Sequence, residues 1–179
     1  MKSAIRRGTR SGLELLLVVI AIAMVPTAAS AADLVVMLVP GIPGSSLVAG
    51  HTGWINVVSF AGSAIGPAAT GGKQACQMVV QKPLDIASPH LWVATVTAQM
   101  FTTPIKIQVI SPGLGGGGAF VLYDIELTNA EITSIGDSGS NAVPLENVTL
   151  KAASVKLTFN EQNPSSGALT PITTSFACD

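Results

Sequence analysis

The sequence predicts a mainly β domain, a small antiparallel β-barrel of two sheets with one short flanking α-helix. Apolar and polar residues alternate with a period of two over six or seven segments, as in half-buried strands. Glycine- and proline-rich stretches separate these segments. Only one segment carries the signals of a helix start. This combination is typical of barrels and sandwiches.

The first two strands are expected at residues 34–39 and 53–60. Pro40-Gly41-Ile42-Pro43-Gly44 ends the first strand, because prolines cannot donate to a ladder. In the second strand, we expect one face to carry Trp54, Val58 and Phe60. Residues 61–73 are mostly Gly, Ala, Ser and Pro, which predicts a long loop.

The third strand and the helix follow. In residues 76–81, Cys76, Met78 and Val80 alternate with more polar neighbours and are expected to face inward. Ser88 is an N-cap candidate, and Pro89 suits the first helical position. The helix, residues 90–99, contains β-branched residues that weaken it in isolation, so we expect it to pack on a sheet.

The second half of the chain predicts four further strands. Residues 105–109 and 121–128 alternate cleanly and flank the glycine-rich hairpin loop 112–118. A short strand is expected at 130–135. The last, residues 147–159, changes its apolar phase midway, which predicts a β-bulge near Ala152-Ala153 that bends the strand.

The first 31 residues are typical of a secretory signal peptide. Four Lys or Arg residues in the first ten precede an apolar run at 15–25, and Ala29-Ser30-Ala31 provides small residues for cleavage. The run is shorter than the roughly 20 residues that span a bilayer, which argues against a stable membrane anchor. We expect cleavage near Ala31 or Ala32, export to the periplasm or medium, and one mature domain at 32–179.

The mature part carries few charges. It has five Lys, no Arg and nine carboxylate side chains, a net charge of −4. Nucleic acid is therefore an unexpected partner, since phosphate contacts require clustered Lys and Arg. Its charged fraction is about 9%, well below the roughly 25% of ordinary soluble domains. Burial against further copies of the chain would explain such a surface.

Two cysteines, Cys76 and Cys178, remain in the mature part. An even number of cysteines in an exported protein favours a disulfide. Two free thiols and links between subunits are the alternatives.

No residue pattern predicts catalytic, cofactor-binding or metal-binding residues, so an enzyme is not expected. Only His51 and His90 could act as bases near neutral pH. No nucleophile elbow accompanies them. The glycine run 113–118 lacks the lysine and helix of a phosphate-binding loop. The cysteines and histidines lack metal-ligand spacing.

Four segments carry a family resemblance in their order along the chain. They are Met37-Leu38-Val39-Pro40-Gly41-Ile42-Pro43-Gly44-Ser45-Ser46, His51-Thr52-Gly53-Trp54-Ile55-Asn56-Val57-Val58-Ser59-Phe60, Lys82-Pro83-Leu84-Asp85-Ile86-Ala87-Ser88-Pro89-His90-Leu91, and Leu145-Glu146-Asn147-Val148-Thr149-Leu150 with Val155-Lys156-Leu157-Thr158-Phe159. Spanning about residues 34–162, they resemble the haemolysin-coregulated protein (Hcp) family. Its members stack as hexameric rings into the inner tube of type VI secretion systems.

The resemblance implies a fold and a function. The fold would be the small two-sheet barrel with a flanking helix. The function would be that of a structural subunit that forms homohexamers, stacks them as rings and carries protein cargo. Turn 40–46 and loop 61–73 would then be contact regions between stacked rings.

Two features differ from the family. Its tube subunits are cytoplasmic and have no signal peptide, and they continue with a charged segment where this chain ends at residues 176–179. The alternative function is therefore an exported binding or adhesion module that keeps the fold but has no role in a secretion tube.

Overall fold

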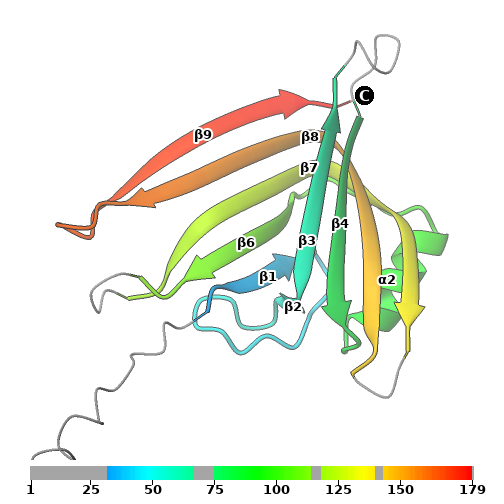
Figure 1. The fold of residues 1–179 in the computed structure, drawn as a ribbon. Coiled ribbons are helices and arrows are strands. Elements are labelled where there is room, and N and C mark those ends of the chain that lie inside the picture. Colours follow the sequence, from blue (N-terminus) through cyan, green and yellow to red (C-terminus); the bar gives the residue numbers. More distant parts are fainter. Residues whose placement is uncertain (1–31, 67–74, 114–117, 140–142, 179) are drawn as a thin grey trace, which may run out of the picture. The chain divides into compact units, whose positions relative to one another are not determined.

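The computed structural model describes residues 32–66, 75–113, 118–139 and 143–178 (Figure 1). The chain separates into residues 1–31 and residues 32–179, and only the second unit is described below. The predicted signal peptide lies outside the described residues. No helix in the described part is long and apolar enough to cross a membrane.

The mainly β fold class with one short helix is confirmed. The described residues form nine strands and one helix: β1 Leu34–Leu38, β2 Ile55–Val57, β3 Ser59–Ile65, β4 Ala75–Pro83, α2 Ser88–Val96, β5 Met100–Phe101, β6 Ile105–Ser111, β7 Phe120–Ser138, β8 Leu145–Gln162 and β9 Leu169–Ala177. All strand pairs are antiparallel, in the order β2-β1-β6-β7-β8-β4-β3, with β5 on β7 and β9 on β8.

A single hydrogen-bonded sheet provides both layers, because the long strands β7 and β8 run through each of them (Figure 1). On one side of β8, β4 pairs up to Lys151 and β9 takes over from Ser154. On the far side of β7, β6 pairs up to Leu127 and β5 from Ala130. The sheet therefore changes layers where both long strands exchange their outer partners, as at the corner of an orthogonal packing.

The bend of β8 lies at the predicted place, but the predicted β-bulge is wrong. The buried set changes from Val148, Leu150 and Ala152 to Val155 across the bend. The β7–β8 register is nevertheless the same on both sides, at Thr128↔Ser154 and Ala130↔Ala152, so no residue is inserted there. Asn129 on β7 instead has a φ of 47° at this point. The register shift of this pair lies between Ile132 and Ser134.

The strand expected at 53–60 is divided at Val58. β2 pairs with β1 and β3 pairs with β4, so Val58 links the two ends of the strand order covalently. No ladder between β2 and β3 closes the sheet in the described residues. Within this stretch, Ile55 is fully buried, whereas Val58 is 54% exposed.

Three further boundaries differ from expectation. Residues 61–65 belong to β3 rather than to a loop, and residues 67–74 lie outside the described residues. The short strand expected at 130–135 is the second half of β7. β9 and the two-residue β5 have no counterpart among the predicted strands. Of the predicted hairpin loop 112–118, residues 114–117 lie outside the described part.

Helix α2 packs on the sheet as predicted, but it starts and ends earlier. Ala87 occupies the N-cap, and Ser88 is already helical. The helix ends at Val96, and Ala98 has a φ of 49°. Leu91 and Ala94 are fully buried, and the helix contacts β7.

The core lies between the layers and contains most of the residues expected to face inward. The buried members of the predicted alternating sets are Cys76, Met78, Val80, Ile105, Ile107, Ile125, Leu127, Val148, Leu150, Ala152 and Val155. Gly62 opposes Met78, and a Cβ on Gly62 would lie 2.9 Å from the Met78 methyl carbon. The small residues of β3 therefore make room for β4 side chains.

Helix docking predicts a matched pair of substitutions. Leu91→Ala should lower the free energy of unfolding by about 2–5 kcal/mol, because it empties a fully buried position. Val96→Ala, at a position that is 76% exposed on the same helix, should change it by less than about 0.5 kcal/mol. Urea unfolding followed by circular dichroism measures both; equal losses would contradict packing as the source of helix stability.

Candidate assembly edges and the network beneath them

A buried ionic network joins two of the four resemblance segments. Lys82 Nζ lies 2.6 Å from Glu146 Oε2 and 2.8 Å from Asp85 Oδ1. The side chains of Lys82 and Glu146 are 0% exposed. The Ser88 hydroxyl donates to Glu146 Oε2 at 2.6 Å and accepts from Lys82 at 3.0 Å. Charges removed from water in this way depend on one another for compensation.

The network holds β4, the start of α2 and β8 together. Asp85 also accepts from the backbone N–H of Ala87, and its own N–H donates to the Ser88 hydroxyl, both at 3.0 Å. Ser88 is thus a bridge to β8 rather than the expected helix cap. Glu146 Oε1 is buried and has no hydrogen-bond partner among the described residues. The arrangement fixes the position of the helix, and its serine and its Glu146 carboxylate are both buried away from solvent.

His51 anchors the loop before β2. Its Nε2 lies 2.7 Å from Gln108 Oε1 on β6, and its ring meets Trp54 edge-on at 4.7 Å. Its second nitrogen lies 3.3 Å from the Ala49 carbonyl oxygen. These partners are an amide, a ring and a carbonyl, none of which His51 could activate as a nucleophile. His90 is an exposed residue of α2.

The turn at 40–46 packs closely on the following segment. Gly44 N–H donates to the Gly53 carbonyl and Ser46 N–H to that of Trp54, at 2.7 and 2.8 Å. A Cβ on Gly44 would lie 2.3 Å from the Trp54 carbonyl oxygen, so only glycine fits. Beyond it, Leu47 is 89% exposed. Gly41, Pro43 and Ser45 are exposed as well, so both the turn and the loop that follows it lie at the surface.

Two long strands form edges of the sheet. Among the described residues, β3 pairs only with β4, and β9 pairs only with β8. β3 (Ser-Phe-Ala-Gly-Ser-Ala-Ile) and β9 (Leu-Thr-Pro-Ile-Thr-Thr-Ser-Phe-Ala) contain no charged residue. Natural proteins usually protect such edges with charges, prolines or bulges, and here Pro171 is the one such residue in either sequence. Both edges can accept another strand.

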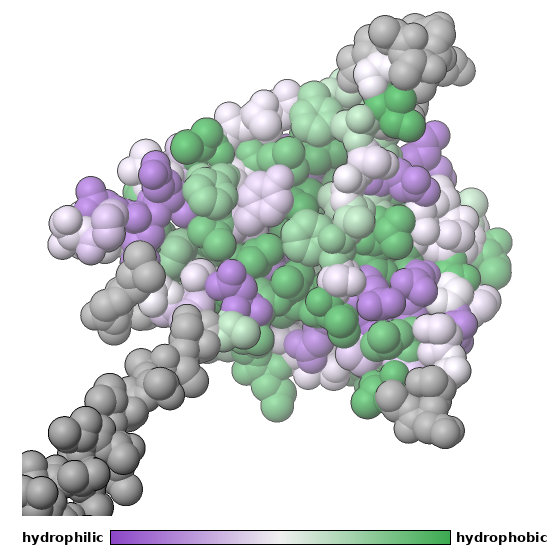
Figure 2. Space-filling model, viewed as in Figure 1, coloured by the Kyte–Doolittle hydropathy of each residue, from purple (hydrophilic) through white to green (hydrophobic). Residues whose placement is uncertain are grey.

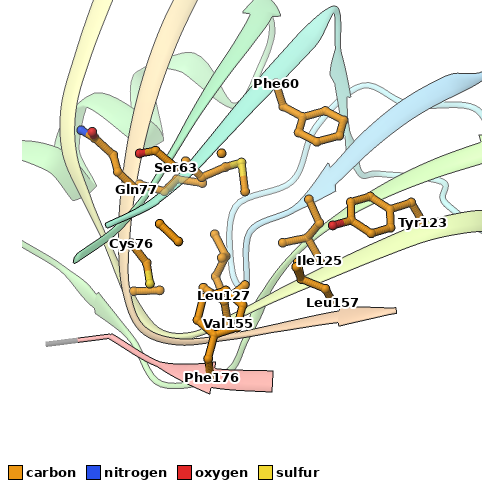
Figure 3. Close-up of a pocket in the computed structure, with 15 residues that line it drawn as sticks. Phe60, Ser63, Cys76, Gln77, Tyr123, Ile125, Leu127, Val155, Leu157 and Phe176 are labelled. Carbon is orange, nitrogen blue, oxygen red and sulfur yellow. The ribbon is translucent and has the colours of Figure 1, made fainter. Parts of the chain in front are cut away.

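An apolar pocket opens between the layers, beside both edges (Figure 3). Its volume is about 260 Å³. β3 and β4 form one wall, including Phe60 and Met78, and Leu157 and Phe176 belong to the opposite wall of β7, β8 and β9. Partial burial raises the pKa of Tyr123, another lining residue, above its ordinary 10.0. No lining residue is charged, so the pocket offers apolar surface rather than acid–base chemistry.

The apolar surface continues beyond the pocket. Figure 2 shows hydrophobic residues in the middle of the molecule. In the same view, Figure 1 shows β3 and the long strands at this place. Phe159 and Ile172, which oppose each other on β8 and β9, are exposed. The same strands carry polar side chains between them, such as Thr158 and Thr173, whose hydroxyls lie 3.1 Å apart. The apolar side chains of Phe159 and Ile172 are thus left uncovered on one face of the β8–β9 pair.

The polar face of the sheet is held by ion pairs. Glu126 on β7 accepts from Lys106 on β6 at 3.2 Å and from Lys156 on β8 at 3.4 Å. Partial burial raises the pKa of Glu126, but the hydrogen bonds and charges of the two lysines lower it more, to below its ordinary 4.5. Six charged side chains thus form ion pairs on this face or in the buried network, and none belongs to β3 or β9.

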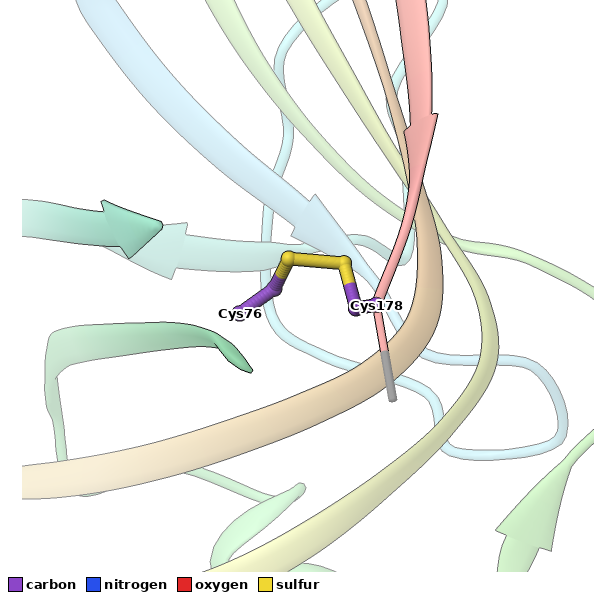
Figure 4. The surroundings of a disulfide bond; sticks show 2 residues. All are labelled: Cys76 and Cys178. Carbon is purple, nitrogen blue, oxygen red and sulfur yellow. A yellow bond between two sulfur atoms is a disulfide. The ribbon is translucent and has the colours of Figure 1, made fainter. Parts of the chain in front are cut away.

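Cys76 and Cys178 form a disulfide at the corner of the sheet (Figure 4). Their Cα atoms are 5.6 Å apart and 102 residues separate them in sequence. Cys178 N–H donates to the Ala153 carbonyl at 2.7 Å, where β8 bends. The bond therefore links the start of β4 to the end of β9.

No metal site is present in the part of the chain described. There, no three His, Cys, Asp or Glu side chains gather closely enough to hold an ion. The sequence had singled out no catalytic or cofactor-binding residue. The network of Lys82, Asp85, Ser88 and Glu146 holds β4, α2 and β8 together. The buried pairing could have been inferred only by combining two segments about 60 residues apart.

The chain matches a family model. The model described as "Type VI secretion system effector, Hcp" matches residues 36–159. That match covers more than two thirds of the chain, including both network segments. A comparison with curated proteins finds no significant match.

Solved structures share the fold at low sequence identity. An Hcp1 structure from Salmonella typhimurium has a TM-score of 0.70 and 18% identity, covering 83% of this chain and 96% of its own. A type VI secretion system effector from Yersinia pestis has a TM-score of 0.67 and 19% identity, over 80% and 98%. The secreted protein Hcp3 from Pseudomonas aeruginosa has a TM-score of 0.60 and 20% identity, over 83% and 99%. At these identities the likeness establishes the fold.

The buried network predicts a strong effect of removing its cation. Lys82→Met should lower the free energy of unfolding by about 3–5 kcal/mol, because Asp85 and Glu146 would be left buried without a positive partner. Lys106→Met, whose pair with Glu126 is partly exposed, should cost only about 0–1 kcal/mol. Chemical denaturation provides the values. Adding Glu146→Gln to Lys82→Met should recover part of the loss; no recovery would contradict an electrostatic origin.

Proposed function

Because this chain belongs to the Hcp family of type VI secretion systems, we propose that its mature domain is a structural subunit that joins further copies of itself into a ring. The observation that carries this proposal is the pair of uncharged sheet edges, β3 and β9, each without a second strand partner among the described residues. A chain in water normally protects such edges. Contact with another copy would protect both.

The geometry favours a head-to-tail joint. β3 and β9 are different edges of one molecule, so a β9 edge against the β3 edge of the next copy makes a heterologous contact. Repeated contacts of this kind close into a ring when the rotation between copies allows it. A homohexamer, stacking of rings and carriage of protein cargo are the finer parts of the proposal. Turn 40–46 and the residues of the predicted loop 61–73 that follow β3 are its candidate contacts between rings.

The ring predicts the size of the purified protein. Light scattering on protein purified after export should give a mass of about six mature chains, as the family resemblance implies. A strict monomer at high concentration would contradict the ring and favour the alternative, an exported binding or adhesion module.

Charged edge variants locate the joint. Ile172→Lys on β9 and Ile65→Lys on β3 should each shift the protein to monomer, because a charged lysine on an edge strand opposes pairing with a further strand. Val96→Lys is the matched control, since Val96 is an exposed apolar residue on α2 rather than on an edge. Circular dichroism should show that all three variants are folded. If only the helix variant dissociated, the joint would lie elsewhere.

The leader adds a second part to the proposal: residues 1–31 direct export and are removed. A host without a type VI secretion apparatus should still export the protein through this leader. Mass spectrometry of the exported protein should then find Ala32 or Asp33 as the first residue. An intact Met1 on exported protein, or protein retained in the cytoplasm, would contradict it.

A further inference from the structure

Strands β4 and β9 follow one another along the same side of β8. The β4 ladder reaches Lys151, and the β9 ladder starts at Ser154. Only Ala152 and Ala153 of β8 lie between them, at the bend. The Cys76–Cys178 disulfide spans this gap, so it ties β9 to a strand with which β9 shares no ladder.

β9 has few other anchors. Phe176 is its one residue that is not exposed, and even Phe176 is only half-buried. A single ladder to β8 and the Thr158–Thr173 hydroxyl contact hold the rest of the strand. An edge strand with so little burial opens locally at low free energy, whereas a crosslink removes many of the open conformations. The disulfide therefore has a large effect on whether β9 stays in place.

The sulfur atoms are protected once the bond exists. Cys76 and Cys178 are 6% and 5% exposed. Exchange requires a thiolate to reach one of the sulfurs, and this burial blocks its approach while β9 is docked. The bond thus forms when β9 is docked, and it resists reduction afterwards. It is therefore a latch rather than a reversible switch.

We infer that the Cys76–Cys178 bond is a redox latch that controls self-assembly of this chain. In the dithiol form β9 opens frequently, and its outer edge is not maintained for a second copy. In the disulfide form β9 is fixed, and the edge is continuously available. This inference rests on the ring proposed above and adds its regulation.

An external disulfide acts as the oxidant that closes the latch. The two thiols lose two protons and two electrons as the sulfur–sulfur bond forms, and a disulfide such as oxidised glutathione takes them up to become two thiols. Reducing cytoplasm keeps the cysteines as thiols, and oxidising compartments outside it favour the bond. Assembly would consequently wait until the chain has been exported.

The test compares oxidised protein with protein that has been reduced in denaturant and refolded in the presence of a phosphine reductant. Hydrogen exchange at residues 169–177 should accelerate roughly tenfold or more on reduction, while exchange in β6, residues 105–111, should change less than about twofold. Light scattering on the same samples should fall from multimer to monomer. Removing the phosphine and then adding oxidised glutathione should restore both the protection of β9 and the multimer.

A cysteine-free variant serves as the control. Cys76→Ser with Cys178→Ser should be monomeric, exchange rapidly at β9, and respond neither to glutathione nor to reductant. If this variant fails to fold by circular dichroism, the refolded reduced protein supplies the same comparison without a substitution.

The outcomes separate the latch from the ring. Exchange at 169–177 that is unchanged on reduction overturns the latch, whatever the oligomer. A multimer that survives reduction with rapid β9 exchange overturns its control of assembly. Oxidised protein that is monomeric overturns the proposed ring itself, and with it any role of the latch in assembly.

Discussion

The fold depends on the continuous pairing of β7 with β8. These two strands form the centre of both layers, and every other part of the sheet is added to one of their outer sides. The partner on each outer side changes where the strands bend, near Asn129 and Ala153, so the bend determines where the core, the pocket and the disulfide lie. The Lys82–Glu146 contact then fixes β4 and α2 onto the β8 end of this centre.

The distribution of charge follows from the same arrangement. Fully buried charges are confined to the Lys82 network, and Glu126 with its two lysines lies on the polar face. The outermost strands on the β8 side, β3 and β9, carry none. Six charged side chains thus form ion pairs that join elements of the fold, and the uncharged edges are the surface that self-association would cover. The uncharged edges therefore contribute to the low charged fraction of the chain.

Much of this fold could be predicted from the sequence, and the omissions have physical causes. The inward faces at Met78, Ile107 and Ile125 alternate because one side of each strand is buried, and the phase change in β8 located its bend. β3 escaped prediction because its Gly, Ala and Ser residues leave room for β4 instead of forming an apolar pattern. β9 escaped because both of its faces are largely exposed and it contains Pro171. Ser88 was assigned locally as a cap, whereas its partner Glu146 lies 58 residues away.

The position of the central pair in the chain also constrains the timing of folding. β4 comes early, yet its neighbour β8 is made only at residues 145–162. Contacts between such distant segments form slowly, because the intervening chain must first be closed into a loop. An emerging chain accordingly cannot complete its core until nearly all of it has left the ribosome. For the export proposed above, a chain whose core is still incomplete suits a translocation channel that admits only unfolded polypeptide.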